Sequence, residues 1–509
     1  MPVPPSSAHH TAARQAPADS GGAPGAARAA GGPAAEQREA ASERAGQRGR
    51  ARGAAPAGTS AARGRLAGLR DRTTAALAPL GAFLTRFAPA VAALTAAVLY
   101  GALSILMWVN YYSPSWDLGI FTQLMDQYSK LQAPIVDIKG PGYNLLGDHF
   151  HPILILLAPV FAVFPSGLTL MLCQTVLFAA SAWPLTSLAF ERLSTKGAWL
   201  LSFAYVFSFG LLNAVTAQFH EIAVAVPLMA FGLVWWMRGR RIGAAVAIGL
   251  LVFCKEDLGL TVAMFGAVVW LKDRRDFRWA LGFAVWGVMW FLYAVFVFIP
   301  MFNTGGGYDY TDNVTLAQTI REGLTTKLGT VGFLALTAGA IGLRSPYILL
   351  MLPTLAWRFA GNVEGYWNLS FHYSAVLMPI AVVALVDAAK RRHRNFAPLV
   401  AAITAVALLS QTSIHLLWDA DRYKVDGGPA VQAASRYGSV GTDLHLLAYL
   451  APKTHVYWTS TLGGVRPDAI ALRPDDTHEP VESWAAKNLG GDWRLVYSGG
   501  GYEVVARQS

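Results

Sequence analysis

Apolar runs of similar length follow one another along most of the chain, from Phe87 to about residue 416. Each run is close to the roughly 20 residues that an α-helix needs to cross the hydrocarbon core of a bilayer. The pattern predicts eleven spans, over residues 87–109, 168–190, 197–216, 221–237, 242–256, 258–271, 278–300, 327–342, 346–360, 372–388 and 396–416. The sequence therefore predicts an all-α polytopic membrane domain over residues 81–418.

Basic residues between the runs predict the orientation, because loops rich in Lys and Arg stay on the cytoplasmic side. The basic clusters are the N-terminal tail, Arg192 with Lys196, residues 238–241, residues 272–278, Arg344 and residues 390–394. Eleven spans that start in the cytoplasm place all of these clusters inside, provided that the apolar stretch 152–164 does not cross. We therefore predict that 152–164 is an interfacial or re-entrant helix in a first outer loop, residues 110–167.

The two ends of the chain differ from this pattern. Residues 1–80 are rich in Ala, Gly, Pro and Arg and contain no aromatic residue. Such a segment buries too little apolar surface to offset its ordering entropy, which predicts a disordered, basic cytoplasmic tail. Residues 419–509 mix polar and apolar positions and predict a small extracytoplasmic α/β domain. Its expected strands are 455–459, 468–472, 493–497 and 502–506, and its expected helices are 429–437 and 443–450.

Composition agrees with a membrane protein and excludes several other classes. Hydrophobic residues make up 54% of the chain and charged residues 14%, against about 25% charged in a typical soluble domain. The net charge of +10 is explained by the tail and the cytoplasmic loops, so nothing calls for a nucleic-acid partner. Two cysteines, both inside apolar runs, exclude a disulfide scaffold and a cysteine-based zinc site.

The polar segments that border the spans all fall on the predicted outer side, and such one-sided clustering of ionisable groups indicates a site. Asp117 directly follows the first span and has aromatic neighbours. Its carboxylate is a candidate general base, while the alternative is a helix cap. Asp148, His149 and His151 precede the stretch 152–164, and His220 precedes a span. These four side chains are candidates to bind phosphate or a divalent metal such as Mg²⁺ or Mn²⁺, although no complete ligand set stands at fixed spacing.

Further candidates lie at the ends of later spans. Lys255, Glu256 and Asp257 are three adjacent charges, and Glu221 begins an earlier span. Lys255 suits phosphate as a compact charge, and the alternative is a structural ion pair between helices. The aromatic segment 364–373, which ends in His372 and Tyr373, predicts either a sugar or lipid-phosphate subsite or an interfacial aromatic belt. The glycine-rich residues 303–308 predict a flexible loop, because the context of a phosphate-binding P-loop is missing.

These motifs together resemble a family of predicted prokaryotic membrane proteins, the domain of unknown function 2079. The matching pieces are residues 116–121 with Gln123, residues 147–150 with 152–154, residues 219–221 and residues 255–257. That family is related to the GT-C glycosyltransferases, so the resemblance implies a GT-C-like fold in which an acidic catalytic residue follows the first span. Asp117 has that position, but it stands alone where many GT-C proteins carry an acid pair. The Ala, Arg and Gly bias also resembles actinobacterial proteins.

The resemblance implies an enzyme of the bacterial cytoplasmic membrane that takes a sugar from a polyprenyl-phosphate donor at the outer face. Asp117 is then the catalytic base. The expected substrate-binding residues are Gln123, His149, His151, His220, Lys255, His372 and Tyr373, and the expected orienting or acceptor-binding residues are Asp148, Glu221, Glu256 and Asp257. The alternatives are a transporter or flippase, and a non-catalytic scaffold of the cell envelope.

Overall fold

The computed structural model describes residues 81–308, 321–361, 363–419 and 424–508, and these residues are mostly helical. The predicted disordered tail, residues 1–80, lies outside the described residues. Every predicted span is helical over much of its length, and several spans consist of two shorter helices. The helices of this part are α2 (Ala88–Val109), α3 (Asp117–Ser129), α4 (Ala158–Val163), α5 (Gly167–Arg192), α6 (Thr195–Val206), α7 (Phe209–Thr216), α8 (Ile222–Met237), α9 (Arg241–Gly249), α10 (Leu258–Lys272), α11 (Phe277–Tyr293), α12 (Ile299–Phe302), α14 (Leu324–Thr337), α15 (Leu352–Ala360), α16 (Glu364–Trp367), α17 (Leu377–Ala388), α18 (Phe396–Leu408) and α19 (Leu416–Asp419).

Breaks in the helices explain why fewer uninterrupted spans are present than the sequence predicted. Among the described residues, four helices are long and apolar enough to cross a bilayer alone, or five when the bent pair 396–411 and 413–419 counts as one. The shorter helices stop at polar motifs. The segment 217–221 separates α7 from α8, and Cys254–Asp257 separates the 3₁₀ turn η3 (Leu250–Phe253) from α10. The count of eleven spans therefore stays a prediction.

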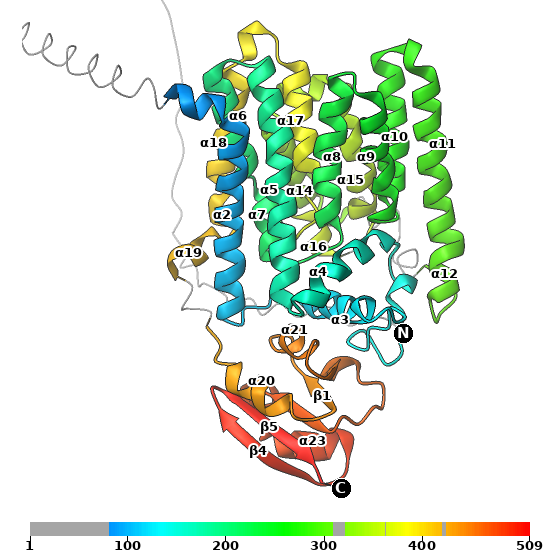
Figure 1. The fold of residues 1–509 in the computed structure, drawn as a ribbon, viewed down its shortest axis with the longest axis vertical. Coiled ribbons are helices and arrows are strands. Elements are labelled where there is room, and N and C mark those ends of the chain that lie inside the picture. Colours follow the sequence, from blue (N-terminus) through cyan, green and yellow to red (C-terminus); the bar gives the residue numbers. More distant parts are fainter. Residues whose placement is uncertain (1–80, 309–320, 362, 420–423, 509) are drawn as a thin grey trace, which may run out of the picture. The chain divides into compact units, whose positions relative to one another are not determined.

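The first outer loop forms two short helical segments that lie across the ends of the long helices (Figure 1). One is α3. The other is the 3₁₀ turn η2 (Pro152–Leu157) followed by α4. A helix rises about 1.5 Å per residue and a bilayer core measures about 30 Å, so the stretch 152–164 is too short to cross. Its length supports the interfacial prediction.

The C-terminal residues form a five-stranded sheet with the order β2-β1-β3-β5-β4. β1 pairs in parallel with β2 and β3, and β5 pairs antiparallel with β3 and β4. The elements are α20 (Gly428–Ala434), β1 (Ser439–Thr442), α21 (Leu447–Leu450), β2 (His455–Trp458), β3 (Ala469–Leu472), α22 (Pro474–Thr477), α23 (Val481–Leu489), β4 (Trp493–Gly499) and β5 (Tyr502–Arg507). The sequence predicted four of these strands. It missed β1, a short central strand that lacks clear alternation, and the helix α23.

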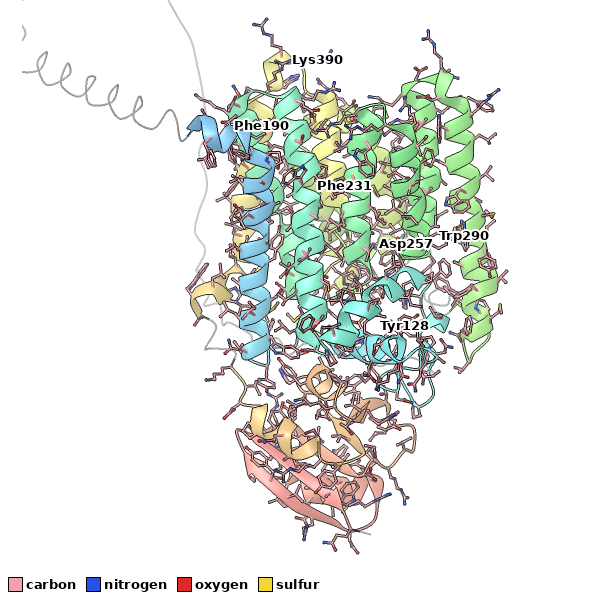
Figure 2. All side chains as sticks on the ribbon, in the orientation of Figure 1. Tyr128, Phe190, Phe231, Asp257, Trp290 and Lys390 are labelled. Atoms are coloured by element: carbon pink, nitrogen blue, oxygen red, sulfur yellow. The ribbon has the colours of Figure 1, made fainter. Side chains whose placement is uncertain are left out.

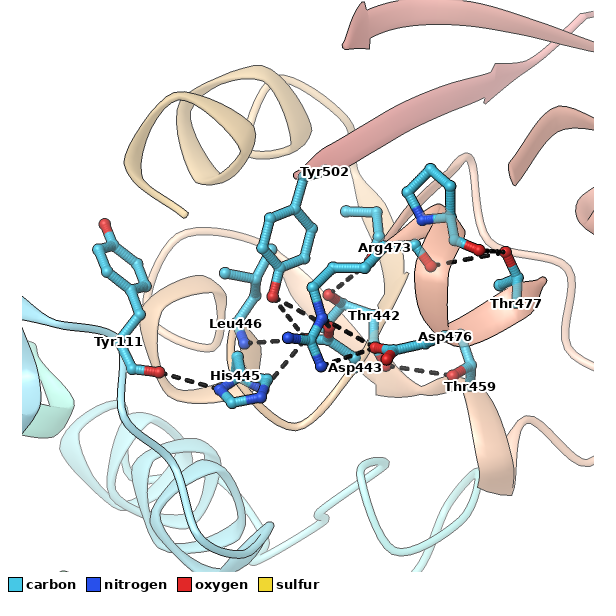
Figure 3. A network of polar contacts seen from close by, with 12 residues as sticks. Tyr111, Thr442, Asp443, His445, Leu446, Thr459, Arg473, Asp476, Thr477 and Tyr502 are labelled. Atoms are coloured by element: carbon cyan, nitrogen blue, oxygen red, sulfur yellow. Dashed lines mark hydrogen bonds and ion pairs between the residues drawn. The ribbon is translucent and has the colours of Figure 1, made fainter. Parts of the chain in front are cut away.

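A polar network joins this α/β domain to the start of the first outer loop. The Tyr502 hydroxyl donates to Asp443, and the Arg473 guanidinium lies 3.6 Å from the same carboxylate. His445, two residues after Asp443, donates through Nδ1 to the Tyr111 carbonyl at 3.0 Å. Figure 3 shows these side chains converging where β1 and β3 end. Hydrogen bonds with the loop backbone therefore fix the domain against the segment that leads into α3.

Gln123 and Trp116 make a second set of contacts with the same domain. The Gln123 amide donates to the Val456 carbonyl at 3.0 Å, and its oxygen accepts from the Ile138 backbone N–H at 3.0 Å. The Trp116 and Trp458 rings meet edge to face, with centroids 4.7 Å apart. Both ends of the segment that carries Asp117 are thus held by the α/β domain.

The ion pair between His455 and Asp137 makes this docking depend on pH. The atoms His455 Nε2 and Asp137 Oδ2 are 2.8 Å apart, and this hydrogen bond raises the pKa of His455 above its usual 6.5. A histidine whose pKa is higher in the folded than in the unfolded protein stabilises the fold. This contribution is fully present below the unfolded pKa and is lost as pH rises through the folded pKa. We expect the melting temperature of wild type to exceed that of His455→Gln most below about pH 6.5 and by less as pH rises. A difference that stays constant between pH 5 and 9 would contradict the pairing.

Candidate functional site

Asp117 begins α3, and its carboxylate is held by two side chains. Ser115 Oγ donates to Asp117 Oδ2 at 2.7 Å, and His220 Nε2 lies 3.3 Å from the same oxygen. Burial would raise the pKa of Asp117, but the charge and hydrogen bond of His220 and the Ser115 hydroxyl lower it below its usual value. The Asp117 side chain keeps 30% of its surface exposed. An ionised, hydrogen-bonded carboxylate that is still open to solvent suits a general base.

His220 links Asp117 to the interior. Its Nδ1 lies 3.4 Å from the Gln218 carbonyl, which accepts hydrogen bonds only, so Nδ1 carries a proton there. Its Nε2 faces the Asp117 carboxylate on the other side of the ring. The His220 ring stacks on His372 with centroids 3.6 Å apart. The break between α7 and α8 thus brings a polar ring against the segment before α17.

Lys255 and Glu221 form a buried ion pair between two helix breaks. Lys255 Nζ donates to Glu221 Oε1 at 2.8 Å, and Lys255 also lies 5.7 Å from the centre of the Trp357 ring. Both side chains are at least nine-tenths buried. The sequence left open whether Lys255 is structural or binds phosphate. The structure gives it the structural partner and also places it at the wall of a cavity.

Glu256 ties the first outer loop to the loop that follows α12. Its carboxylate lies 2.8 Å from His149 Nδ1 and accepts from the Phe150 backbone N–H at 3.0 Å and from the Tyr308 hydroxyl at 2.8 Å. Burial alone would lower the pKa of His149, but the Glu256 charge raises it above its usual value. The Asn303 side chain also donates to the Gly147 carbonyl at 2.9 Å. The described residues 303–308, predicted as a flexible loop, therefore make specific contacts with the cluster.

Asp148 and His151 complete the loop part of the cluster. Burial would raise the pKa of Asp148, but Lys139, at 2.6 Å, and His149 lower it to about 2. Burial lowers the pKa of His151 to about 4, which favours the neutral ring. His151 Nδ1 has no hydrogen-bond partner within the described part of the chain. Asp148 is thus a paired anion, and His151 is a neutral ring near Phe121.

A partly open cavity lies beside Lys255, with about 290 Å³ of free space including its mouth. Its lining comes from α8, α10, α15 and the segment before α17, and consists of Ile222, Lys255, Asp257, Leu258, Thr354, Trp357, His372, Tyr373 and Val376. Figure 2 shows Asp257 among the helices, between the end of the bundle near Tyr128 and the opposite end near Lys390. The cavity therefore brings together residues of two predicted motifs, 255–257 and 364–373.

Two groups of residues have contacts in the structure that differ from the roles the sequence predicted: Gln123 and the candidate metal ligands. Gln123, expected to bind substrate, is buried and uses both ends of its amide to join the loop to the α/β domain. Within the described residues, no group of three or more metal-ligating side chains is gathered closely enough to hold an ion. The metal candidates Asp148, His149 and His220 instead pair with Lys139, Glu256 and Asp117 respectively. The fourth candidate, His151, takes part in none of these three pairs.

Arg358 is a site residue that the sequence analysis missed. It is 0% exposed and donates to the Tyr366 and Asn368 carbonyls, both at 2.8 Å, and to the Ser374 hydroxyl at 3.2 Å. These bonds hold the segment that presents His372 to the cavity. An arginine inside the apolar run 346–360 was the available signal, since a charge within a span marks a functional or structural partner. Trp357, beside it, looked like an ordinary apolar residue and gave no signal.

Comparisons with known proteins identify the family and the fold of this chain. A family model described as "Predicted membrane protein (DUF2079)" matches residues 108–419. No curated protein matches the chain. A crystal structure of ArnT from Cupriavidus metallidurans bound to undecaprenyl phosphate superposes with a TM-score of 0.54 at 12% identity, covering 82% of this chain and 98% of that one. Its apo structure gives a TM-score of 0.42 at 12% identity, with 80% and 97% covered. At this identity the first likeness shows a shared fold.

Proposed function

This chain belongs to the DUF2079 family of predicted membrane proteins, and we propose that it is an integral-membrane glycosyltransferase that uses a polyprenyl-phosphate sugar as donor. The observation that carries the proposal is the partly exposed Asp117 paired with His220, whose ring stacks on His372 at the cavity of Lys255. A base is thus connected through two stacked histidine rings to the cavity that holds the Lys255 ammonium, as acid–base chemistry beside a phosphate requires. The shared fold with ArnT, a GT-C glycosyltransferase seen with undecaprenyl phosphate, supports it.

In the proposed reaction, Asp117 takes the proton from an acceptor hydroxyl as that oxygen attacks the anomeric carbon of the donor sugar. The bond between this carbon and the phosphate oxygen breaks, and the lipid phosphate leaves with the bonding electrons. Lys255 and the His220 ring stabilise the negative charge that develops on the phosphate. The proton passes from Asp117 to solvent through its exposed side. No step depends on a bound metal.

An apolar groove supports a lipid substrate. It lies between α9 and α11, with about 840 Å³ of free space including its open side, and is lined by residues such as Val246, Phe253 and Trp286. Phe253 contacts Trp290, and Trp290 stacks on Phe150 with centroids 5.8 Å apart. The Phe150 backbone in turn donates to Glu256, so a series of contacts joins Phe253 in the groove wall to the polar cluster. We propose that the groove holds the polyprenyl chain of the donor.

The topology belongs to the same proposal. We infer a cytoplasmic tail of residues 1–80, a membrane domain of residues 81–418 with eleven spans, and an extracytoplasmic domain of residues 419–509 in a bacterial cytoplasmic membrane. Two observations support this topology. The polar motifs gather near α3 and the α/β domain. Residues of the predicted cytoplasmic clusters, Arg241 and Lys272, instead form ion pairs with Asp276 and Asp387 at other helix ends. Acceptor hydroxyls then reach Asp117 from outside the cell.

Binding of undecaprenyl phosphate to the full chain in lipid nanodiscs tests the function. We expect it to bind at least about tenfold more tightly than undecaprenol, which lacks the charge that the site stabilises. His220→Gln changes a group assigned to the phosphate and should weaken this preference, whereas Lys272→Gln, distant from the cavity, should preserve it. Equal binding of the two lipids would overturn the proposal, and lipid movement across the bilayer without sugar transfer would favour a flippase.

A further inference from the structure

The cavity beside Lys255 contains polar atoms that nothing in the described part of the chain satisfies. Asp257 Oδ1, Thr354 Oγ1 and His372 Nδ1 are buried atoms without a hydrogen-bond partner there. All three residues line the same cavity, and Thr354 and His372 are more than nine-tenths buried. A buried polar group without a hydrogen-bond partner destabilises a protein, so three in one space indicate a ligand that supplies the missing bonds.

We infer that this cavity is a subsite for the hydroxyl-bearing edge of a neutral monosaccharide, an inference that rests on the proposed function and identifies the class of sugar that is transferred. A sugar hydroxyl both donates and accepts. The hydroxyls of a sugar edge can donate to Asp257 Oδ1. They can also donate to, or accept from, the Thr354 hydroxyl and His372 Nδ1, each of which can be a donor or an acceptor. The phosphate of the donor does not do this, because it is a diester and has no proton to donate to a carboxylate oxygen.

The orientation of Asp257 is already fixed for such a contact. The Trp357 indole donates to Asp257 Oδ2 at 2.9 Å, so one carboxylate oxygen is occupied and the other is left for a ligand. The Trp357 and Tyr373 rings lie in the same lining with centroids 5.8 Å apart at 80°. Aromatic walls cover the apolar C–H faces of a sugar ring, while the polar groups bind its edge.

The charges of the lining select against charged sugars. Lys255 and Asp257 both line the cavity and carry opposite charges, so the charged group of a uronic acid or an amino sugar would meet one like charge beside each opposite one. Removing that charged group from water would then not be offset, which favours a neutral sugar. The enclosed part of this space is small, so it admits a hydroxyl of the sugar edge and not a whole ring.

Two lipids that differ by one hexose test this inference in nanodiscs. The probes are undecaprenyl phosphate and undecaprenyl phosphate glucose. We expect wild type to bind the glucose-bearing lipid about tenfold more tightly, as one or two added hydrogen bonds give. Asp257→Asn keeps the acceptor for Trp357 but turns a donor toward the sugar, and Thr354→Val removes the hydroxyl. Each should abolish the tenfold preference and leave binding of undecaprenyl phosphate unchanged.

Thr404→Val is the matched control, because Thr404 is a buried threonine on α18 whose hydroxyl bonds its own helix. It should retain the full preference. If Asp257→Asn does not fold, Thr354→Val still decides the question. Wild type that binds both lipids equally, or variants that keep the preference, would overturn the sugar subsite while the lipid-phosphate function stands. Wild type that binds neither lipid would overturn the proposed function itself.

Discussion

Asp117→Asn should lower the rate of sugar transfer by about 10³-fold, because removal of a positioned general base typically costs 10²–10⁴-fold. Asparagine keeps the size of the side chain and can still accept from Ser115, whose hydroxyl bonds the carboxylate at 2.7 Å. It cannot take a proton from the acceptor. The rate is measured as transfer of radiolabelled sugar from polyprenyl-phosphate donor lipids to the acceptor fraction of membranes that carry the full chain.

Two comparisons make this result specific to the base. Binding of undecaprenyl phosphate to Asp117→Asn should stay within a factor of about three of wild type, because phosphate stabilisation is assigned to other residues. Asp126→Asn changes a second carboxylate of α3, which pairs with Lys130 at 2.6 Å, and should transfer at the wild-type rate. Full transfer by Asp117→Asn at normal expression would show that Asp117 is not the base.

Lys255→Met should lower the free energy of unfolding by about 3–5 kcal/mol, because it leaves the Glu221 carboxylate buried without its partner. The double variant Lys255→Met with Glu221→Met should recover most of the loss, since two apolar side chains remove the uncompensated charge. Thermal unfolding followed by tryptophan fluorescence in detergent measures both effects as shifts of the melting temperature.

The comparison pair is Lys130 with Asp126, in which the lysine side chain is 55% exposed. Lys130→Met should cost no more than about 1 kcal/mol, as is usual for exposed ion pairs. A Lys255→Met protein that melts with wild type would mean that Glu221 finds another partner. Recovery of stability in the double variant without recovery of lipid-phosphate binding would separate the structural role of Lys255 from its role at the site.

Local pattern was enough to predict most of the secondary structure. The predicted apolar runs became helices such as α2, α5, α8 and α11, because a helix satisfies every backbone hydrogen bond within the run and so suits an apolar segment in a membrane domain. The short length of 152–164 was likewise a local property. Four of the five strands of the C-terminal sheet were predicted from alternation, while β1 was missed because it is short and is covered on both faces by other elements.

The sequence by itself determined the family, the helical membrane domain, and the ionisable motifs that stand where helices break. Tertiary structure alone decided which of these groups meet: Asp117 with His220, Glu256 with Tyr308, and Asp257 with Trp357. It also assigned Gln123 to domain docking. The physical reason is that hydrophobic periodicity reports burial, which is local, whereas a hydrogen bond or ion pair depends on two atoms that chain folding brings together from distant positions.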